Sequence, residues 1–256
     1  KGVNMEDKET VYRLAHIDDL ITKVLRYNMI NTTDYLTPAE QLMVENILNK
    51  EQQIKYLKIG GYDHAERMIF CIYPYYLDIE YYEVPIKVIK IEWNSRYYNL
   101  AHRHILGALM GLGIKREKIG DIITESGAGY VFVISDIVPF ILSNMVNVGN
   151  ASVLCKSFDY DQIPIPAPKT KIINATVPSM RLDAVASAGF GLSRTKIVSY
   201  IKSGSAKINW LVVDRPDSLL SMGDLISIRG LGRVKLKEIA GITKKGRISI
   251  LLERFV

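Results

Sequence analysis

The sequence predicts an α+β protein with a helical N-terminal part, a ferredoxin-like or RNA-recognition-like central domain and a basic C-terminal domain. Two observations carry this prediction. Helical apolar spacing at the start gives way to alternating strand and helix patterns, and a proline-rich stretch then precedes a strongly cationic end. The expected boundaries are 1–50 for the helical region, 51–160 for the central domain, 161–175 for the linker and 176–256 for the C-terminal domain.

The pattern of the N-terminal region predicts two helices. Apolar residues recur at helical spacing between Tyr12 and Met29. Thr37, Pro38 and Glu40 mark the start of a second helix. Threonine can cap the helix, proline suits its first position, and glutamate can complete a capping box.

The central region alternates strands and helices. From Ile86 onward the order is strand, helix, strand, strand, helix, strand, which is typical of the split βαβ arrangement of ferredoxin-like and RNA-recognition folds. The segment 125–129 is expected to join two strands as a hairpin. The expected strands cover 54–59, 68–73, 86–93, 119–123, 130–134 and 152–155, and the expected helices cover 100–112 and 137–146.

Two features of the central region bear on RNA binding. Tyr130 and Phe132 share one face of a strand on which RNA-recognition domains place stacking aromatics. The basic-aromatic signature of those domains is missing, so core packing is the preferred interpretation. Lys115, Arg116 and Lys118 form a basic turn at a helix end. Two roles of this turn are given equal weight. It can contact RNA or protein, or its charges can simply compensate the helix dipole.

Positive charge is concentrated at the C-terminal end. Residues 1–170 hold 18 Lys and Arg against 21 Asp and Glu, a balance of −3, whereas residues 171–256 hold 15 against 6, a balance of +9. Solubility alone does not require this segregation. A polyanionic partner for the C-terminal third explains it.

Membrane insertion, secretion and metal binding find no support in the sequence. No apolar run reaches the ~18 residues needed to span a bilayer, and residues 1–9 lack the apolar core of a secretion signal. Cys71 and Cys155 lie far apart in apolar runs, which favours buried, reduced thiols in a cytoplasmic protein. His102 and His104 point in different directions on a helix, so neither a metal site nor a cofactor is expected.

The C-terminal region carries cations at helix and strand positions. Arg194 and Lys196 fall in the first turn of a helix capped by Ser193, where cations cost roughly a few tenths of a kcal/mol. With the free backbone N–H groups they can form a phosphate site; the alternative is a solvated basic face. The phosphate site is preferred because cations recur through the same small unit. The side chains expected to bind RNA are Arg181, Ser193, Arg194, Lys196, Lys202, Lys207, Asn209, Arg229 and Arg233.

About sixty residues of this region resemble the S4 RNA-binding domain, which grips structured RNA with paired helices and a short sheet. Spacing and chemistry agree at many points. The segments that carry the resemblance are Arg181–Asp183, Leu192–Lys196, Ile201–Gly204, Lys207–Asn209 and Gly223–Ile226.

Further segments extend the resemblance to nearly the whole chain. Gly60–Arg67, His102–Ile122 and Ser227–Arg233 resemble the YlmH family of bacterial proteins. That resemblance implies a C-terminal S4 domain and cytoplasmic work on the large ribosomal subunit, with binding of peptidyl-tRNA in ribosome-associated quality control. The implied partners are ribosomal RNA of the large subunit and tRNA, with other quality-control factors as further candidates; a link to cell division is also implied. The N-terminal region is short for the family.

An RNA-modifying enzyme is the main alternative. Arg181-Leu182-Asp183 matches, by eye, the catalytic aspartate motif of pseudouridine synthases. Only Lys237–Val256 follows the S4-like segments, which is too little for their catalytic domain, so Asp183 is expected to form a salt bridge within the helix pair. No catalytic residue is therefore predicted. A pocketed cluster of acid and base groups in the first 170 residues would favour the enzyme, and an adaptor anchored on RNA is the third possibility.

Overall fold

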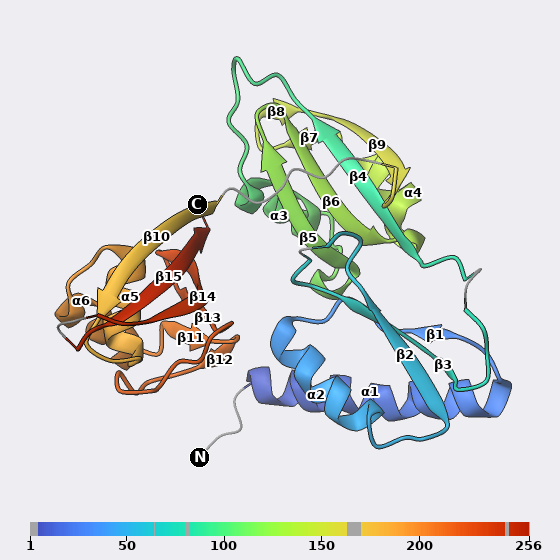
Figure 1. Ribbon diagram of the computed structural model, residues 1–256. Helices are drawn as coiled ribbons and strands as arrows, with labels where there is room; N and C mark the ends of the chain where they lie inside the picture. Colours follow the sequence, from blue (N-terminus) through green and yellow to red (C-terminus); the bar gives the residue numbers. More distant parts are fainter. Residues whose placement is uncertain (1–4, 64, 80–81, 163–169, 244–245, 256) are drawn as a thin grey trace. The chain divides into compact units, whose positions relative to one another are not determined.

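A computed structural model describes residues 5–63, 65–79, 82–162, 170–243 and 246–255. The chain divides into two compact units, Lys1–Pro166 and Ala167–Val256, and each is considered by itself (Figure 1). Its mixture of helices and antiparallel sheets confirms the predicted α+β class. Among the described residues no helix is both long enough and apolar enough to cross a membrane.

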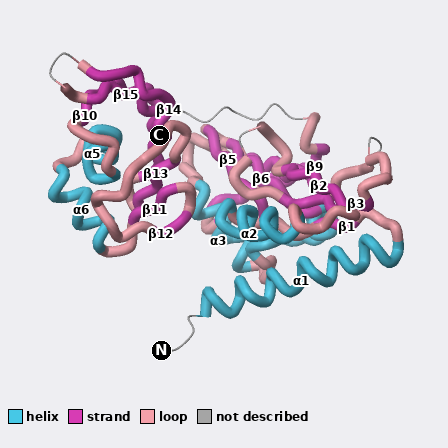
Figure 2. The backbone as a smooth tube through the Cα atoms, turned by 60° about the horizontal axis from the view of Figure 1, so that its bottom comes forward, coloured by secondary structure: helices cyan, strands magenta, loops and turns pink. Residues whose placement is uncertain are grey.

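The first unit begins with two helices on a small antiparallel sheet of order β1-β3-β2. Apolar side chains of both helices, among them Val24 and Leu48, form a core with Phe70 and Ile72 of the central strand. Figure 2 shows α1 running below this sheet. The elements are α1 (Met5–Tyr27), β1 (Asn31–Thr32), α2 (Pro38–Leu48), β2 (Ile54–Ile59) and β3 (Ile69–Pro74).

The start of α2 confirms the predicted capping box. The Thr37 side chain accepts a hydrogen bond from the backbone N–H of Glu40 at 3.4 Å, and the Glu40 carboxylate accepts one from the backbone N–H of Thr37 at 2.7 Å. Both donors would otherwise lack a partner within the helix. The first helix begins at Met5, before the expected Tyr12.

A second, four-stranded antiparallel sheet follows, with the order β5-β6-β4-β9. Helix α3 connects β4 to β5 and helix α4 lies between β6 and β9, which is the predicted split βαβ arrangement. Both helices cover one face of the sheet, where Ile105, Leu109 and Ile141 enter a core with the strands. The elements are β4 (Ile86–Glu92), α3 (His102–Gly111), η1 (Arg116–Lys118), β5 (Ile119–Glu125), β6 (Ala128–Ile134), η2 (Ser135–Ile137), α4 (Val138–Asn144), β7 (Asn147–Val148), β8 (Ala151–Ser152) and β9 (Leu154–Asp159).

The opposite face of this sheet packs on the N-terminal layer. Tyr130 and Phe132 are 7% and 0% exposed and share a core with Tyr35 and Ile69. The Tyr62 ring stacks on Phe132 with centroids 5.0 Å apart. The structure therefore confirms core packing for these two aromatics and removes them as a platform for RNA bases.

The pairing of β2 and β3 corrects the boundary expected at residue 50. Both strands pair with each other, and β3 pairs with β1, in the sheet that carries α1 and α2. They belong to the N-terminal layer rather than to the central domain. Strand patterns show which residues are extended, but they do not show which strands pair.

The second unit is a six-stranded antiparallel sheet of order β10-β15-β14-β13-β11-β12 with two helices on one face. A Cβ atom on Gly189 of α5 would lie 2.7 Å from Val234, so glycine permits this close helix–sheet contact. The elements are β10 (Thr170–Val177), α5 (Leu182–Phe190), α6 (Arg194–Lys202), β11 (Ala206–Ile208), β12 (Leu211–Val212), β13 (Leu225–Ile228), β14 (Gly232–Ile242) and β15 (Ile248–Phe255).

The proline-rich linker expected at 161–175 is only partly open to comparison, because residues 163–169 lie outside the described part. Residues 170–175 are not linker. They belong to β10, which pairs with β15 along its whole length, from Thr170 opposite Phe255 to Val177 opposite Ile248. Strand β10 thus extends the C-terminal unit to residues before the expected start at 176.

Candidate nucleic-acid interface

Two helix starts form the first part of the candidate interface. Gly191, at a φ of 67°, ends α5 in the left-handed conformation that glycine tolerates. Ser193 then caps α6, accepting a hydrogen bond from the backbone N–H of Lys196 at 3.3 Å. A short turn therefore joins the two helices.

The carboxylate of Asp183 joins the two helix starts. It is 4% exposed and accepts a hydrogen bond from Arg181 Nε at 3.3 Å and another from Arg194 Nη2 at 2.6 Å. Its backbone N–H donates to the Pro216 carbonyl at 3.0 Å. Charge-assisted bonds of this kind are shorter and stronger than neutral ones. The salt bridge that the sequence predicts within the helix pair is confirmed.

Burial of Asp183 also removes the feature that suggested a synthase. A catalytic aspartate must reach a substrate, whereas each oxygen of this carboxylate is occupied by an arginine and its side chain is 6% exposed. Asp183 therefore positions Arg181 and Arg194 and does not face a ligand.

The two arginines keep much of their surface open. Their side chains are 42% and 48% exposed, and a guanidinium has five N–H donors, of which Asp183 uses one on each. Lys196 is exposed beside them in sequence. The geometry thus presents oriented donors that suit phosphate oxygens.

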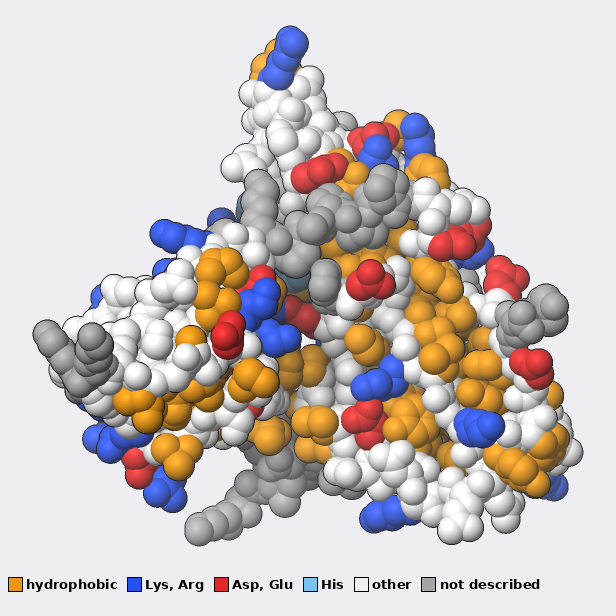
Figure 3. Space-filling model, viewed as in Figure 1, with side chains coloured by type: hydrophobic (Ala, Val, Ile, Leu, Met, Phe, Trp, Pro, Cys, Tyr) orange, Lys and Arg blue, Asp and Glu red, His pale blue; other side chains and the backbone are white. Residues whose placement is uncertain are grey.

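The second part of the candidate interface is the sheet face opposite the helices. Lys207, Ser227, Arg233 and Phe255 are paired across neighbouring strands, so their side chains share one face. The buried Val234, next to Arg233, points to the helices instead. We call this surface the open sheet face; it also carries Lys235 and Lys237, which alternate with buried core residues along β14. Figure 3 shows several Lys and Arg side chains along the outline of this unit.

Aromatic rings support the arginine of the open sheet face. The guanidinium carbon of Arg233 lies 4.9 Å from the Phe255 ring centroid and 6.0 Å from that of Trp210. Between Arg233 and Lys207, the covered Ser227 hydroxyl has no hydrogen-bond partner among the described residues. Lys237 lies 3.6 Å from the Glu253 carboxylate.

Asn209, one of the residues predicted to bind RNA, stabilises a turn through its side chain. With Trp210 it forms a turn between β11 and β12, at φ values of 46° and 71°. Its amide oxygen accepts from the backbone N–H of Leu225 at 3.0 Å, and its amide nitrogen donates to Asp224 at 2.7 Å. Strand β11 therefore ends at Ile208, because asparagine accommodates the left-handed turn.

The remaining predicted residues are exposed but less clearly grouped. Lys202 lies in the last turn of α6, and Arg229 follows β13, where its backbone N–H donates to the Ser205 carbonyl at 3.0 Å. The exposed cations that sequence reasoning missed include Arg215, 75% exposed beside Asp217, and Lys235 and Lys237 on the open sheet face. The alternation of β14 after Arg233 was a signal that could have identified the two lysines.

The basic turn of the central domain has mainly internal contacts. Arg116 donates to the backbone carbonyls of Ile119 and Gly120, and burial lowers its pKa. Lys118 pairs with Asp34 at 2.9 Å and with Asp136 at 3.2 Å. Burial alone would lower the pKa of Lys118, but these carboxylates outweigh it and raise the pKa. Only Lys115 of the three is exposed, so the turn is mainly structural.

A buried arginine links the two layers of the first unit. Arg67 is 8% exposed and donates to the carbonyls of Tyr35 at 2.9 Å and Ile119 at 3.0 Å. Asp121 accepts from the backbone N–H groups of Glu66 at 2.6 Å and Arg67 at 3.2 Å, and burial raises its pKa. These residues lie in the segments that resemble the YlmH family, and their contacts are structural.

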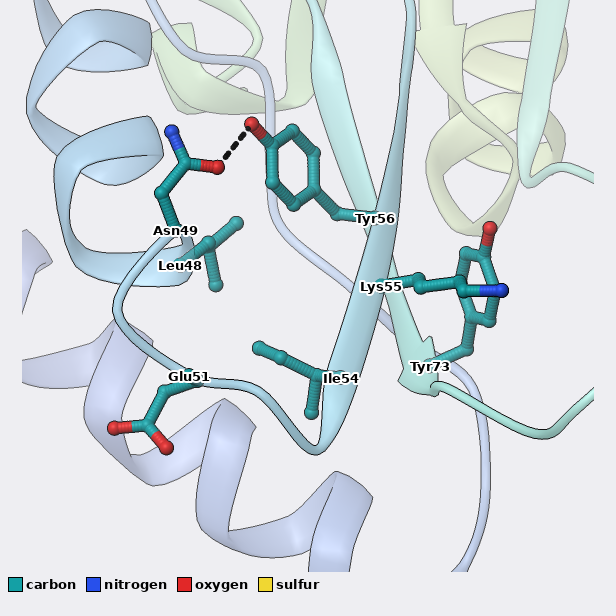
Figure 4. A pocket seen from close by; sticks show the side chains of 7 residues that line it. All are labelled: Leu48, Asn49, Glu51, Ile54, Lys55, Tyr56 and Tyr73. Carbon is teal, nitrogen blue, oxygen red and sulfur yellow. Dashed lines mark hydrogen bonds between the residues drawn. The ribbon is translucent and has the colours of Figure 1, made fainter.

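A cavity of the first unit, lined by Glu51, Lys55 and Tyr56 among others, does not supply a catalytic cluster. It measures about 360 Å³ and lies between the end of α2 and β2 (Figure 4). Tyr56 donates its hydroxyl hydrogen to Asn49 at 2.9 Å, while Glu51 points away from both. In the described part of the chain no group of three His, Cys, Asp or Glu side chains could hold a metal ion.

Comparison with known proteins identifies the family. Residues 7–77 match the family model "YlmH, N-terminal", and residues 80–162 match "Putative RNA-binding domain in YlmH". The chain is 35% identical over 222 residues to ribosome-associated protein quality control protein P2 of Bacillus subtilis, covering 87% of this chain and 86% of the relative. The chain belongs to the YlmH family.

Within the YlmH family, the two matched domains coincide with the two layers of the first unit. Strands β2 and β3 fall within 7–77, as their pairing with β1 requires, and the four-stranded sheet falls within 80–162. A solved structure, the cell division protein ylmH from Streptococcus pneumoniae, aligns with a TM-score of 0.51 at 20% identity, over 64% of this chain and 98% of that one. This similarity concerns the fold.

Proposed function

We propose that this YlmH-family chain binds RNA of the large ribosomal subunit together with peptidyl-tRNA and acts in rescue or quality control of stalled translation. The Bacillus subtilis relative is named for ribosome-associated protein quality control, and a matched domain is named for RNA binding. The +9 balance of residues 171–256 supports a polyanionic partner for the C-terminal unit.

The observation that carries the proposal is the pair of arginines held by Asp183. A free arginine side chain loses conformational entropy when it binds a phosphate, and a buried carboxylate that already orients it removes part of that cost. Arg181 and Arg194 therefore offer preoriented donors at two helix starts, where backbone N–H groups also favour anions. The exposed Lys196 adds a further positive charge.

The second support is the open sheet face. Arg233 and Lys207 alternate with residues that pack on the helices, so the strands display cations to solvent without disturbing the core. A surface of this kind binds phosphates with little sequence preference and positions the protein on structured RNA. Two paired helices and a short sheet also suit the S4-type domain that we assign to this unit.

Binding without catalysis is part of the proposal. The one motif that matched a synthase by eye holds a buried, doubly paired aspartate. We expect the modified nucleosides of ribosomal RNA and tRNA, measured by mass spectrometry, to be the same in cells with and without the protein. A modification that disappears on deletion and stays absent with Asp183→Asn would show an enzyme instead.

Sedimentation with crosslink mapping tests the binding proposal. Purified chain is mixed with large ribosomal subunits, with or without peptidyl-tRNA, and crosslinked by ultraviolet light. We expect cosedimentation to be stronger when peptidyl-tRNA is present, and RNA crosslinks in peptides that contain Arg181, Arg194 or Lys196. Lys55→Ala, at an exposed lysine of the first unit, is the matched control. Cosedimentation with crosslinks only to ribosomal proteins would refute the proposal.

A further inference from the structure

The segment 94–116 of the first unit contains no Asp or Glu, although residues 1–170 have a net balance of −3. Its cations include Arg96 and Arg103, and His102 and His104 flank Arg103. The segment therefore carries only neutral and basic side chains. The segment begins in the loop between β4 and α3, residues 93–101, which projects from the four-stranded sheet (Figure 1).

The loop has a defined conformation built on two residues at its start. Trp93 is 8% exposed, and its indole N–H donates to the Tyr98 carbonyl at 3.1 Å. The Asn94 side chain accepts from the backbone N–H of Arg96 at 3.0 Å, and the Asn94 carbonyl accepts from the backbone N–H groups of Tyr97 and Tyr98 at 3.3 Å and 3.1 Å. These bonds fix the turn that carries Arg96 and Tyr97.

Tyr97 is 78% exposed, more than any other large hydrophobic side chain in the described part of the chain. Arg96 precedes it and is also exposed. Figure 3 shows a basic and a hydrophobic side chain together at the tip of the projecting loop. Leaving an aromatic ring in water on an ordered turn forgoes the free energy of burying it, which a binding partner would recover.

The ring and the cations together fit unpaired RNA. Bases stack on exposed aromatic rings with little sequence preference, while neighbouring arginines bind the backbone phosphates. Helix α3 adds Arg103 at its start and has no acidic residue in its first turn. The sheet face that RNA-recognition domains use for stacking is closed here by Tyr35 and Ile69. Tyr97 is the most exposed aromatic residue among the described residues of the central domain.

We propose that the β4–α3 loop is a second RNA contact, in which Tyr97 stacks on an unpaired base and Arg96 and Arg103 bind the flanking phosphates. The inference rests on the proposed function in one respect, because it takes from it that the partner is RNA. It assigns a site to the central domain that is separate from the arginine pair and the open sheet face of the C-terminal unit.

Crosslinking to a short single-stranded RNA tests this contact in the full chain. The probe is about a dozen nucleotides long, a length within the range of single-strand sites, and contains 4-thiouridine. After irradiation and trypsin digestion, the loop peptide 97–103 is measured separately from the C-terminal peptides. We expect a crosslink on the loop peptide. Arg96→Gln leaves Tyr97 in place but removes a trypsin site, so its loop peptide is 91–103. The crosslink yield on that peptide should be about five-fold below the wild-type yield at 0.1 M salt, the loss expected for one phosphate contact on a single strand.

Replacement of the ring gives the second readout. Tyr97→Ala should weaken binding of the single-stranded probe about ten-fold and change binding of the same RNA in a duplex little, because only unpaired bases can stack. Tyr97→Phe keeps the ring and should bind like the wild type. Tyr75→Ala is the matched control, since Tyr75 is 55% exposed on the same unit and outside the loop.

The outcomes separate this inference from the proposed function. Crosslinks in C-terminal peptides without any in peptide 97–103 would overturn the loop contact and leave the proposed function standing. Crosslinks in neither would overturn the loop contact, and only crosslinks confined to ribosomal proteins on the large subunit would overturn the proposed function as well. If Tyr97→Ala released the chain from ribosomal subunits but bound the RNA probe normally, the loop would contact protein and the inference would be wrong.

Discussion

At the scale of single residues, the buried carboxylate of Asp183 determines how two arginine side chains are oriented. Its two oxygens accept from two arginines on different helices. The carboxylate therefore stabilises the helix pair and orients the guanidinium groups together. A role limited to offsetting a helix dipole would place it at the surface, but it is 4% exposed.

Asp183→Asn tests this dual role. The change removes the charge from two charge-assisted hydrogen bonds, so we expect the free energy of unfolding to fall by about 2 kcal/mol. Chemical denaturation measures it. Asp217→Asn is the control, because its partner Arg215 is 75% exposed and such surface pairs contribute little to stability. Equal losses in the two variants would show that burial of Asp183 has no energetic importance.

The thiol of Cys71 gives a second prediction, for stability at high pH. Cys71 is fully buried, and burial raises its pKa from 9.0 to about 12. Between these values the unfolded chain loses the thiol proton and the folded chain keeps it, so stability falls as pH rises, by about 1.4 kcal/mol per pH unit for this group. Cys71→Ala should show a correspondingly smaller slope between pH 9 and pH 11. Identical slopes would contradict the prediction.

Residue roles were predictable where local chemistry decides them. The Thr37–Glu40 capping box and the Asp183 salt bridge depend on short spacings that can be seen in the sequence. The turn at Asn209 was not predicted, because it places Trp210 in a left-handed conformation, which tryptophan rarely adopts. Lys118 has internal partners because segments distant in sequence meet there. Arg116 instead donates to the carbonyls of Ile119 and Gly120, three and four residues further along the chain.

At the scale of elements, strand and helix positions were predictable and strand pairing was not. The strand at 54–59 was placed at its observed bounds, and the order of strands and helices from Ile86 onward predicted the four-stranded sheet. The partners of β2 and β3 lie in a layer that local pattern does not specify. Strand β10 was hidden by the prolines before it, although its inward residues Ile173, Ala175 and Val177 alternate as in a half-buried strand.

Strand β10 gives a prediction about fragments. It pairs with β15 over eight residues, so a fragment of residues 167–256 should fold by itself and keep RNA binding. A fragment of residues 178–256 lacks β10, exposes the edge of β15 and should be less stable and prone to aggregate. Thermal unfolding and gel filtration distinguish the two. If both fragments behaved alike, β10 would be dispensable and the unit would begin after it.

At the scale of the whole molecule, the separation of charge into two units is the property from which function follows. In the first unit, buried polar contacts such as those of Arg67 and Asp121 join the two layers. The second unit displays cations at two helix starts and on the open sheet face. The amino-acid composition alone predicted this division of charge, because the net charge of a segment does not depend on how its strands pair. Which cations face solvent required the structure.

The salt dependence of binding to large ribosomal subunits tests the central claim most directly. Binding of a polyanion releases counterions in proportion to the phosphates neutralised, so affinity should fall steeply as salt rises. Lys196, Lys207 and Lys235 are exposed and lie outside the cores, so replacing all three with alanine should leave the fold intact. The log–log slope should become shallower by about one per lysine. Lys23→Ala, at an exposed position of the first unit, should leave the slope unchanged. A binding constant independent of salt, or a triple variant with the wild-type slope, would contradict RNA binding by the C-terminal unit.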